Sequence, residues 1–304
     1  MKYFNYFYFL TISIFLFSCS NEQTQNVELK GNAMGTFYFI KLIDVPIKIK
    51  EEKLTLEINK TLLEINKIVS NWDNLSEISV LNSNKTLLPI KISNNLLDVF
   101  KTANFIHIKS NGYFDITLDP IIDLWGFGYK KDKMKKEPPL KEDVLETLLL
   151  VNQKKYLEIN QSNNELVKKN KDVSFNLSAI GKGYGIDLIG KKLKNLKINN
   201  FLINIGGDIL TNGYNSKKQD WVIGIENPNL QQQYIKEIIN VTNKGVATSG
   251  DYKNFFDNNG KKYSHIINPK SGMPINHSTK SVTVIEESAM LADGWATAFL
   301  AMGS

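Results

Sequence analysis

The stretch "NLSAIGKGYGID", Asn176–Asp187, places three glycines and one lysine where an irregular segment is predicted to turn into a helix. It contains neither the G-x-x-x-x-G-K-[ST] spacing nor the G-x-G-x-x-G spacing, so it is not one of the common nucleotide-phosphate signatures. It does combine a predicted N-cap at Ser178, glycines that leave room for a backbone approach, and Lys182 at the helix start. These are the parts of an anion site, although a structural turn has the same composition.

On both sides of this stretch, helical and strand-like patterns are mixed without the regular alternation of a doubly wound sheet. Helices are predicted at 50–69, in the second half of 70–82, and at 94–110, 141–150, 181–196 and 288–302. Strands are predicted at 35–43, 155–159, 165–168, 200–210, 221–228, 238–241 and 281–287. This mixture predicts an α+β fold.

The size and charge of the chain limit the classes of function. Its 304 residues are enough for one large domain or two closely packed lobes. The net charge of +6 is compatible with nucleic-acid binding, but the lysines are dispersed among asparagines and isoleucines. Because no basic stripe is interleaved with aromatic residues, we expect no nucleic-acid partner.

The N-terminus has the pattern of an export signal. Lys2 is followed by an apolar run to Phe17, and a run of about 15 residues is shorter than the roughly 20 that a spanning helix needs. The run ends at Leu16–Cys19, which resembles a bacterial lipobox. We therefore predict a signal peptide that is removed before Cys19, with an uncleaved membrane anchor as the alternative.

This prediction sets the expected domain limits. Residues 1–18 are the signal peptide, 19–30 a lipidated N-terminus and polar tether, and 31–304 the folded domain. The protein is then a membrane-anchored lipoprotein that faces the periplasm or the cell exterior. Cys19 is the single cysteine of the chain, which excludes disulfides and thiolate metal sites.

The segment "ADGWAT", residues 292–297, offers oxygen ligands. Asp293 and Thr297 are four residues apart on a predicted helix, so their side chains lie on one face. Such a pair can hold Mg²⁺ when phosphates supply further oxygens, whereas the alternative is an aspartate that only caps or pairs. The small apolar neighbours predict burial of this face, where a lone carboxylate is costly.

Three histidines are present, at positions 107, 265 and 277. His107 falls in an amphipathic helix and is predicted to be structural, and His277 lies among polar residues and is predicted to be solvated. His265 closes a strand-like run just before a proline and glycine turn, where a side chain suited to proton transfer near neutral pH has a functional position. A carboxylate such as Asp251 is the alternative proton acceptor.

Further clusters place glycine, a carboxylate and a small hydroxyl in a turn after an apolar strand. They are "GYFDITLDPIIDLWGFG" (112–128), "NIGGD" (204–208) and "VATSGDY" (246–252). Structural turns explain any one of them, but so many in one chain indicate a shared site.

Taken in order, these clusters resemble the ApbE family of flavin transferases. The matching elements are Met34-Gly35-Thr36, "SNWDNLSEISVLN", "FDITLDPIIDLWGFG", "LSAIGKGYGID", "NIGGD", "TSGDY", "HIINPKSG" and "ADGWATAF", which together span residues 31–302. The resemblance implies a T-fold-like, two-lobed α+β architecture with FAD in a central cleft.

The resemblance also implies a reaction and a set of site residues. The family moves FMN from FAD to a threonine or serine hydroxyl of an acceptor protein, typically a subunit of a membrane redox pump, and releases AMP. Mg²⁺ would be bound by Asp293, Thr297 and the backbone carbonyl of Ala179, and His265 would be tied to activity. The residues implied to contact FAD are Met34, Trp72, Phe114, Asp115, Ile116, Asn176, Lys182, Thr248 and Ile267.

Three features depart from the family pattern. Asn176 stands where an aspartate is common, Trp72 replaces the more usual tyrosine, and the sequence ends at Ser304 where relatives usually continue. Two alternative functions share the same site. One is a Mg²⁺-dependent FAD pyrophosphatase that yields FMN and AMP, and the other is a lipoprotein that binds flavin without chemistry.

Overall fold

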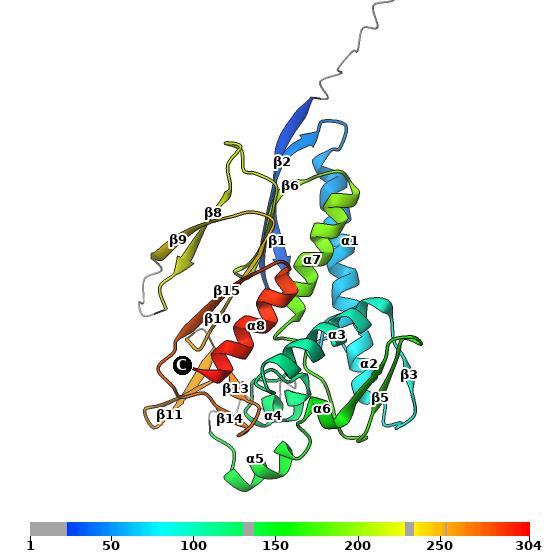
Figure 1. Cartoon of the computed structure of the whole chain (residues 1–304), viewed down its shortest axis with the longest axis vertical. Helices are drawn as coiled ribbons and strands as arrows, with labels where there is room; N and C mark the ends of the chain where they lie inside the picture. The colour runs from blue at the N-terminus through cyan, green and yellow to red at the C-terminus, as the bar shows by residue number, and fades with distance from the viewer. Residues whose placement is uncertain (1–22, 130–136, 229–233, 253) are drawn as a thin grey trace, which may run out of the picture.

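The computed structural model describes residues 23–129, 137–228, 234–252 and 254–304 (Figure 1). The predicted signal peptide and the lipidation site at Cys19 lie outside the described residues and stay predictions. Within the described ranges, no helix combines the length and the apolar character needed to cross a membrane.

A six-stranded antiparallel sheet forms the body of the molecule, in the order β1-β2-β6-β7-β10-β15. The strands are β1 Thr24–Ala33, β2 Thr36–Pro46, β6 Asn200–Ile205, β7 Asp208–Asn212, β10 Gly245–Gly250 and β15 Ser281–Glu286. Because β1 begins at Thr24, the tether predicted for 19–30 is wrong from that residue onward. The segment is polar in overall composition, but the alternation of side chains along the strand places Val27 and Leu29 on the buried face.

A tight turn joins β1 to β2. Met34 and Gly35 have φ angles of 52° and 75°, which is the left-handed conformation that a two-residue hairpin turn requires at both positions. Met34 is therefore held in a conformation that side-chain-bearing residues rarely adopt.

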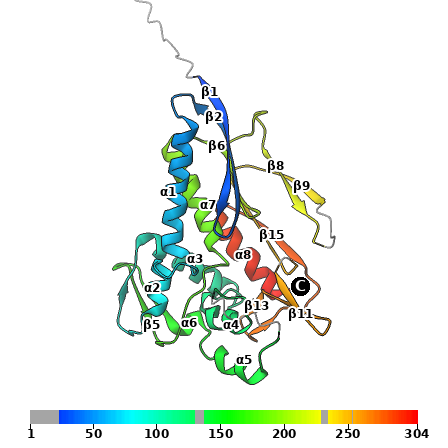
Figure 2. The same cartoon turned by 180° about the vertical axis from the view of Figure 1, so that it is seen from behind.

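Helices cover one face of the sheet and a hairpin covers the other (Figures 1 and 2). Helices α7 (Gly181–Asn195) and α8 (Ala289–Met302) lie on the sheet, and α1 (Glu51–Val69) and α3 (Asn94–Lys109) pack against them. In β6, Phe201, Ile203 and Ile205 belong to this main core. Leu202 points the other way, toward the hairpin of β8 (Trp221–Glu226) and β9 (Ile235–Val241). Because successive side chains of a strand point to opposite faces of the sheet, β6 contributes to the main core on one face and to the hairpin core on the other.

The rest of the chain forms a second, mainly helical half and a group of short hairpins. The second half contains α2 Glu77–Ser83, β3 Ile90–Lys91, the 3-10 helix η1 Ile116–Leu118, α4 Asp119–Leu124, α5 Lys141–Leu148, α6 Gln153–Tyr156, β4 Leu157–Asn160 and β5 Glu165–Lys168. The hairpin strands are β11 Phe255–Asn258, β12 Lys261–Ser264, β13 Ile267–Asn268 and β14 Met273–Pro274.

The predicted α+β class is confirmed, and so are the long helices, within one or two residues at each end. The segment "VATSGDY" was predicted as a turn after a strand, and this is wrong because Gly245–Gly250 is itself strand β10. Its small residues are weak strand formers, but α8 lies directly on them. A Cβ on Gly245 would stand 2.5 Å from the backbone nitrogen of Ala289, so close packing decides the conformation.

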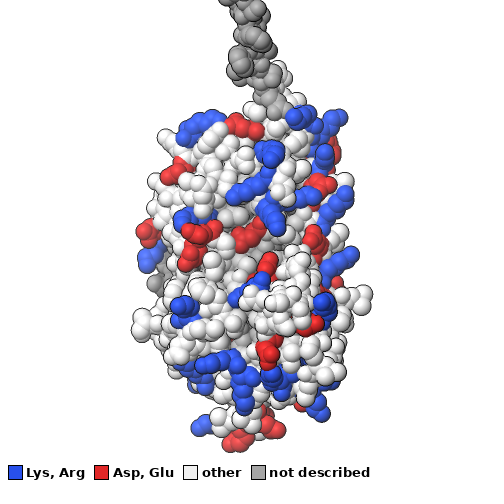
Figure 3. Space-filling view, turned by 45° about the vertical axis from the view of Figure 1, so that its right-hand side comes forward, with Lys and Arg blue, Asp and Glu red and all other residues white. Residues whose placement is uncertain are grey.

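Charges of both signs are interspersed over the face seen in Figure 3, where lysines alternate with acidic side chains. This face therefore carries no broad patch of one sign, as expected from the dispersed lysines of the sequence.

Candidate functional site

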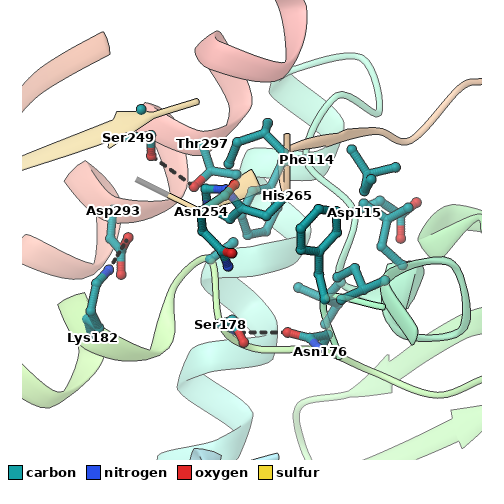
Figure 4. A pocket seen from close by; sticks show the side chains of 18 of the residues that line it. Phe114, Asp115, Asn176, Ser178, Lys182, Ser249, Asn254, His265, Asp293 and Thr297 are labelled. Atoms are coloured by element: carbon teal, nitrogen blue, oxygen red, sulfur yellow. Dashed lines mark hydrogen bonds and ion pairs between the residues drawn. The ribbon is translucent and has the colours of Figure 1, made fainter. Parts of the chain in front are cut away.

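A pocket of about 410 Å³ opens where the sheet, α7, α8 and the second half of the molecule meet. Its wall comes from segments far apart in the sequence, including the loop before α2, the 113–118 segment, the start of α7, the β6–β7 turn, β10, and the loop before β13. Figure 4 shows side chains from the 113–118 segment, the start of α7, β10, α8 and the loop before β13 converging on one space. Lys182 and Asp293 lie on one side of this space and Phe114 on the other, and we call these the charged end and the aromatic end.

Lys182 lies between two buried carboxylates at the charged end. Its Nζ is 2.5 Å from Asp208 Oδ2 and 3.2 Å from Asp293 Oδ1. Burial alone would lower the pKa of Lys182, but the two carboxylates outweigh it and raise the pKa above its ordinary value. Burial raises the pKa of Asp208 to about 6, with Lys182 opposing the rise and Asp293 adding to it. One ammonium thus faces two carboxylates, and the excess negative charge favours a further cation.

The oxygens around Asp293 suit a hard cation. Thr297 lies one turn along α8, and its Oγ1 is 3.2 Å from Ser249 Oγ (Figure 4). Ala179 also lines the pocket. No group of three or more His, Cys, Asp or Glu side chains that could hold a metal occurs in the described ranges. A cation here would therefore take hydroxyl, carbonyl and ligand oxygens, which is the habit of Mg²⁺ at phosphate sites.

The backbone of α7 also contributes to the charged end. Gly183 donates its N–H to Asp293 Oδ2 over 2.9 Å. The predicted N-cap at Ser178 is wrong, because α7 begins at Gly181 with Ile180 at the cap position and no side-chain cap. A carboxylate from α8 takes the place of a local cap, so the first turn of α7 is bound to Asp293.

Trp72 marks the aromatic end of the pocket. Its side chain is 62% exposed and lines the wall together with Phe114, Ile116 and Ile267. The preceding residue, Asn71, fixes the loop, because its amide donates to the carbonyl of Phe175 over 2.8 Å and accepts from the N–H of Leu177 over 3.0 Å. Trp72 thus follows a residue that is bound to the 175–177 segment. Its exposed ring meets Tyr129 in a T-shaped contact with 6.4 Å between ring centroids, and an indole presents a large face for stacking.

Asp115 lines the pocket, but its carboxylate serves the fold. Oδ1 accepts the N–H of Thr117 over 2.8 Å, and Oδ2 accepts the N–H of Gln153 over 2.9 Å. Thr248 also lines the pocket, and its hydroxyl pairs with that of Thr283 over 2.9 Å. Both residues line the pocket, and the FAD contacts that the family resemblance implies for them stay predictions.

Asn176 bridges the pocket wall and a buried charge. Its Nδ2 donates to Asp119 Oδ1 over 3.1 Å, and its Oδ1 accepts the N–H of Ser178 over 3.0 Å (Figure 4). Asp119 is 1% exposed and also accepts from Ser174 Oγ. An aspartate at position 176 would place a second carboxylate against Asp119, whereas the amide of Asn176 donates a hydrogen bond to that carboxylate.

His265 reaches the pocket from the loop between β12 and β13. Its Nδ1 is 2.8 Å from the carbonyl oxygen of Asn254, which can only accept, so Nδ1 carries the proton and Nε2 is left as an acceptor. Burial lowers the pKa of His265, against the opposing effects of the Asn254 carbonyl and of Asp251. The imidazole is therefore neutral near pH 7.

Some predicted residues lie elsewhere. Among the described residues, the pocket wall does not include Asp251 or Met34. Asp251 Oδ2 is 3.4 Å from Lys280 Nζ, so Asp251 acts on His265 only through its charge. Met34 belongs to the hairpin turn, and its sulfur lies 3.1 Å from where a Cβ on Gly185 would be.

The other two histidines have structural contacts. His107 is buried with Nδ1 2.8 Å from the carbonyl of Phe114, which confirms its predicted structural role. His277 was predicted to be solvated, and this is wrong. Its Nε2 is 2.9 Å from the carbonyl of Leu300 in the last turn of α8, where the helix leaves carbonyls unsatisfied.

Asp208 and Ser249 belong to the glycine-containing clusters of the sequence, but the sequence assigned no role to either residue, and it assigned none to Asp187. Asp208 follows two glycines between adjacent strands, and Ser249 lies in the small-residue strand that was predicted as a turn. Asp187 is the last residue of the segment 176–187. The carboxylate beside a glycine turn marked Asp208 as a candidate, but only the fold brings it to Lys182.

Comparison with known proteins gives a consistent set of relatives. The ApbE family model matches residues 34–304. The chain is 35% identical to the FAD:protein FMN transferase of Vibrio cholerae over 295 residues, which covers 96% of this chain and 86% of that protein. It is also 35% identical to the Haemophilus influenzae protein of the same name over 298 residues, covering 97% and 85%.

Solved structures agree with these sequence relatives. The flavin transferase ApbE of Vibrio cholerae superposes with a TM-score of 0.84 at 35% identity, covering 93% of this chain and 88% of that one. The apo form of the Pseudomonas stutzeri flavinyl transferase ApbE superposes with a TM-score of 0.82 at 30% identity, covering 93% and 86%.

Proposed function

This chain belongs to the ApbE family, and from this premise we propose that it is an FAD:protein FMN transferase, an enzyme that moves FMN from FAD to a partner protein. The observation that carries the proposal is that one pocket wall holds both the exposed aromatic ring of Trp72 and the charged group of Lys182, Asp208 and Asp293. FAD carries groups that match both kinds of lining residue, because it has a flat ring system at one end and a charged pyrophosphate in its middle.

The proposed orientation follows from this match. The isoalloxazine ring would stack on Trp72 and contact the apolar wall of Phe114, Ile116 and Ile267. The pyrophosphate would lie toward Lys182, whose ammonium remains charged at physiological pH because its pKa is raised. Asn176 lines the same pocket and would border the bound flavin.

We propose that Mg²⁺ is the cation of the charged end. Asp293, Thr297 and the carbonyl of Ala179 would hold it, and the excess of carboxylate over ammonium there supports a cation. When bound, Mg²⁺ supplies charge neutralisation at the phosphate oxygens. Lys182 adds a fixed positive charge, and Ser249 holds the Thr297 hydroxyl in place.

The transfer itself needs a hydroxyl and a proton acceptor. The hydroxyl oxygen of an acceptor threonine or serine would form a bond to the phosphorus of the FMN half. The bond between that phosphorus and the bridging oxygen would break, and AMP would leave with the bridging oxygen. His265 would take the hydroxyl proton on Nε2, and the hydrogen bond from its Nδ1 to the carbonyl of Asn254 supports this role because it leaves Nε2 as the acceptor. Asp251 would act indirectly, by favouring the protonated imidazole.

The setting of the reaction is also part of the proposal. We propose that the protein is exported and anchored through lipidated Cys19, and that its acceptor is a redox-pump type of flavoprotein with a modifiable threonine or serine. These statements rest on the N-terminal sequence pattern and on the family resemblance.

The decisive experiment incubates the purified protein with FAD, Mg²⁺ and a candidate acceptor. A flavin mass gain and in-gel fluorescence on the acceptor, with one AMP released per modification, are the expected results. An acceptor whose target threonine is replaced by alanine is the control. Free FMN with an unmodified acceptor would instead indicate a pyrophosphatase, and FAD that stays intact would indicate a binding protein without chemistry.

A further inference from the structure

Helices α7 and α8 meet at a crossing where their backbones are in direct contact. A Cβ on Gly183 would stand 2.3 Å from the carbonyl oxygen of Ala289 and 2.6 Å from Cα of Met290. Only glycine permits this approach. The first turn of α7 therefore lies against the first turn of α8.

Two aspartates fasten this crossing from opposite sides. Asp187, one turn after Gly183 on α7, accepts the N–H of Ala289 on Oδ1 over 2.9 Å and the N–H of Met290 on Oδ2 over 3.0 Å. Asp293, one turn after Ala289 on α8, accepts the N–H of Gly183 over 2.9 Å. The carboxylate of each helix thus caps the start of the other helix.

The cap from Asp187 is additional to the ordinary one. Ser288 already caps α8 by accepting the N–H of Leu291 over 3.0 Å, and Ala292 donates to the carbonyl of Ser288. Asp187 takes the two remaining first-turn donors of α8. With all four donors satisfied from inside the protein, the start of α8 is fixed to α7 rather than available to an anion.

We infer that Asp187 is a positioning residue for the transfer reaction, and that it sets the carboxylate of Asp293 by holding the first turn of α8 against α7. The inference rests on the proposed function, in which Asp293 is a cation ligand. Asp187 makes its own hydrogen bonds to the backbone of residues 289 and 290, so it acts through the position of the helix. Asp293 follows these residues by one turn on the same face.

The test compares Asp187→Asn with Ser93→Ala in the otherwise intact chain. Asparagine keeps the size of the side chain, but its amide nitrogen cannot accept the second N–H. Ser93→Ala removes the cap of α3, where Ser93 accepts from Leu96 and bonds Glu77, and serves as the matched loss of one helix cap. Two readouts that require no turnover are the affinity for Mn²⁺ alone, from free Mn²⁺ measured by electron paramagnetic resonance, and amide hydrogen exchange of the 181–185 segment.

We expect Asp187→Asn to weaken Mn²⁺ binding about tenfold and to speed exchange of the Gly183 amide, while Ser93→Ala changes neither. Equal Mn²⁺ affinity in the two variants, with the wild type still binding, overturns the inference and leaves the proposed function intact. If the wild type binds Mn²⁺ only when FAD supplies phosphate oxygens, the same comparison of variants is made with FAD present. A wild-type protein that binds Mn²⁺ under neither condition overturns the cation assignment of the proposed function, and the inference with it. Faster exchange without weaker Mn²⁺ binding also overturns it, because the helix would then be held for stability alone.

Discussion

Gly183 and Ala289 bring two helices into backbone contact, with 2.3 Å between the position of a Cβ on Gly183 and the carbonyl oxygen of Ala289. This contact explains the composition of the stretch around Gly183. The glycine is needed where α7 crosses α8, and the crossing places Lys182 beside Asp293. What resembles a phosphate loop in the sequence is first of all a helix-packing site.

The first prediction concerns the glycines of this stretch. Gly183→Ala should lower the free energy of unfolding by about 3 kcal/mol or more, because the new methyl group meets backbone atoms that cannot rotate away. Gly181→Ala should be neutral or slightly stabilising, since its Cβ would meet only Val69 Cγ2 at 3.6 Å and alanine favours the helix. Urea denaturation of both variants measures the difference, and equal stability of the two would contradict the crossing described here.

The second prediction concerns the charged end of the pocket. Asp293→Asn should reduce Mg²⁺-dependent AMP release from FAD at least about 100-fold, because loss of a ligand charge costs several kcal/mol of transition-state stabilisation. The variant should remain folded, since asparagine can still accept the N–H of Gly183. Asp220→Asn, at an exposed position, is the control and should keep full activity. Substantial turnover in Asp293→Asn would rule out Asp293 as the metal ligand.

The third prediction separates stacking from chemistry. Trp72→Ala should weaken FAD binding about tenfold or more, because stacking of a base or ring on an aromatic side chain is worth about 1–3 kcal/mol. Trp72→Tyr should bind almost as well as the wild type. Leu75→Ala, in the same loop and 86% exposed, should change nothing. Titration with FAD in the presence of a chelator checks all three, and unchanged affinity in Trp72→Ala would place the flavin elsewhere.

The fourth prediction concerns the pH dependence of activity. Because burial lowers the pKa of His265 below its ordinary value of 6.5, the imidazole stays neutral and able to accept a proton to below that pH. The transfer rate should therefore hold from neutral pH down past 6.5 and fall only as His265 becomes protonated in the folded state. In His265→Gln the rate should drop and lose this acid limb. An acid limb that persists in the variant would assign it to another group.

The fifth prediction concerns the pH dependence of stability through Asp208. Its folded-state pKa of about 6 lies above the ordinary value of 3.8, so the folded protein binds this proton more tightly than the unfolded chain. The contribution of Asp208 to stability therefore rises as pH falls through about 6 and declines at higher pH. The stability of the wild type relative to Asp208→Asn should be greater at about pH 4.5 than at about pH 7.5. The opposite trend would mean that the pairing with Lys182 dominates over burial.

Local patterns predicted much of the fold because they depend on neighbouring residues. The apolar face of 50–69 and the spacing of Asp293 and Thr297 follow from helical periodicity, and the structure has both. The predictions failed where packing overrides propensity. Strand β10 is built from small residues because α8 lies on it, and β1 begins inside a segment whose polar composition indicated a tether.

For the candidate site, too, the sequence predicted some residues and not others. The sequence indicated Lys182, His265 and Asp293 as chemically suited residues, and the structure brings them to one pocket. It gave Asp208 no role beyond its place in the 204–208 cluster, and it assigned Met34 and Asp251 to a site whose wall, among the described residues, does not include them.

By itself, the sequence determined which residues share a helix face, the strands β2, β6 and β15, and which family of proteins the chain resembles. Only the tertiary structure decided that Lys182 is shared by Asp208 and Asp293, that Asn176 is paired with Asp119, and that Asp187 fastens α8 to α7. The reason is physical. Periodicity fixes the direction of a side chain relative to its own helix or strand, whereas a contact across many residues depends on how those elements pack, and in this protein the packing depends on glycines that let two backbones touch.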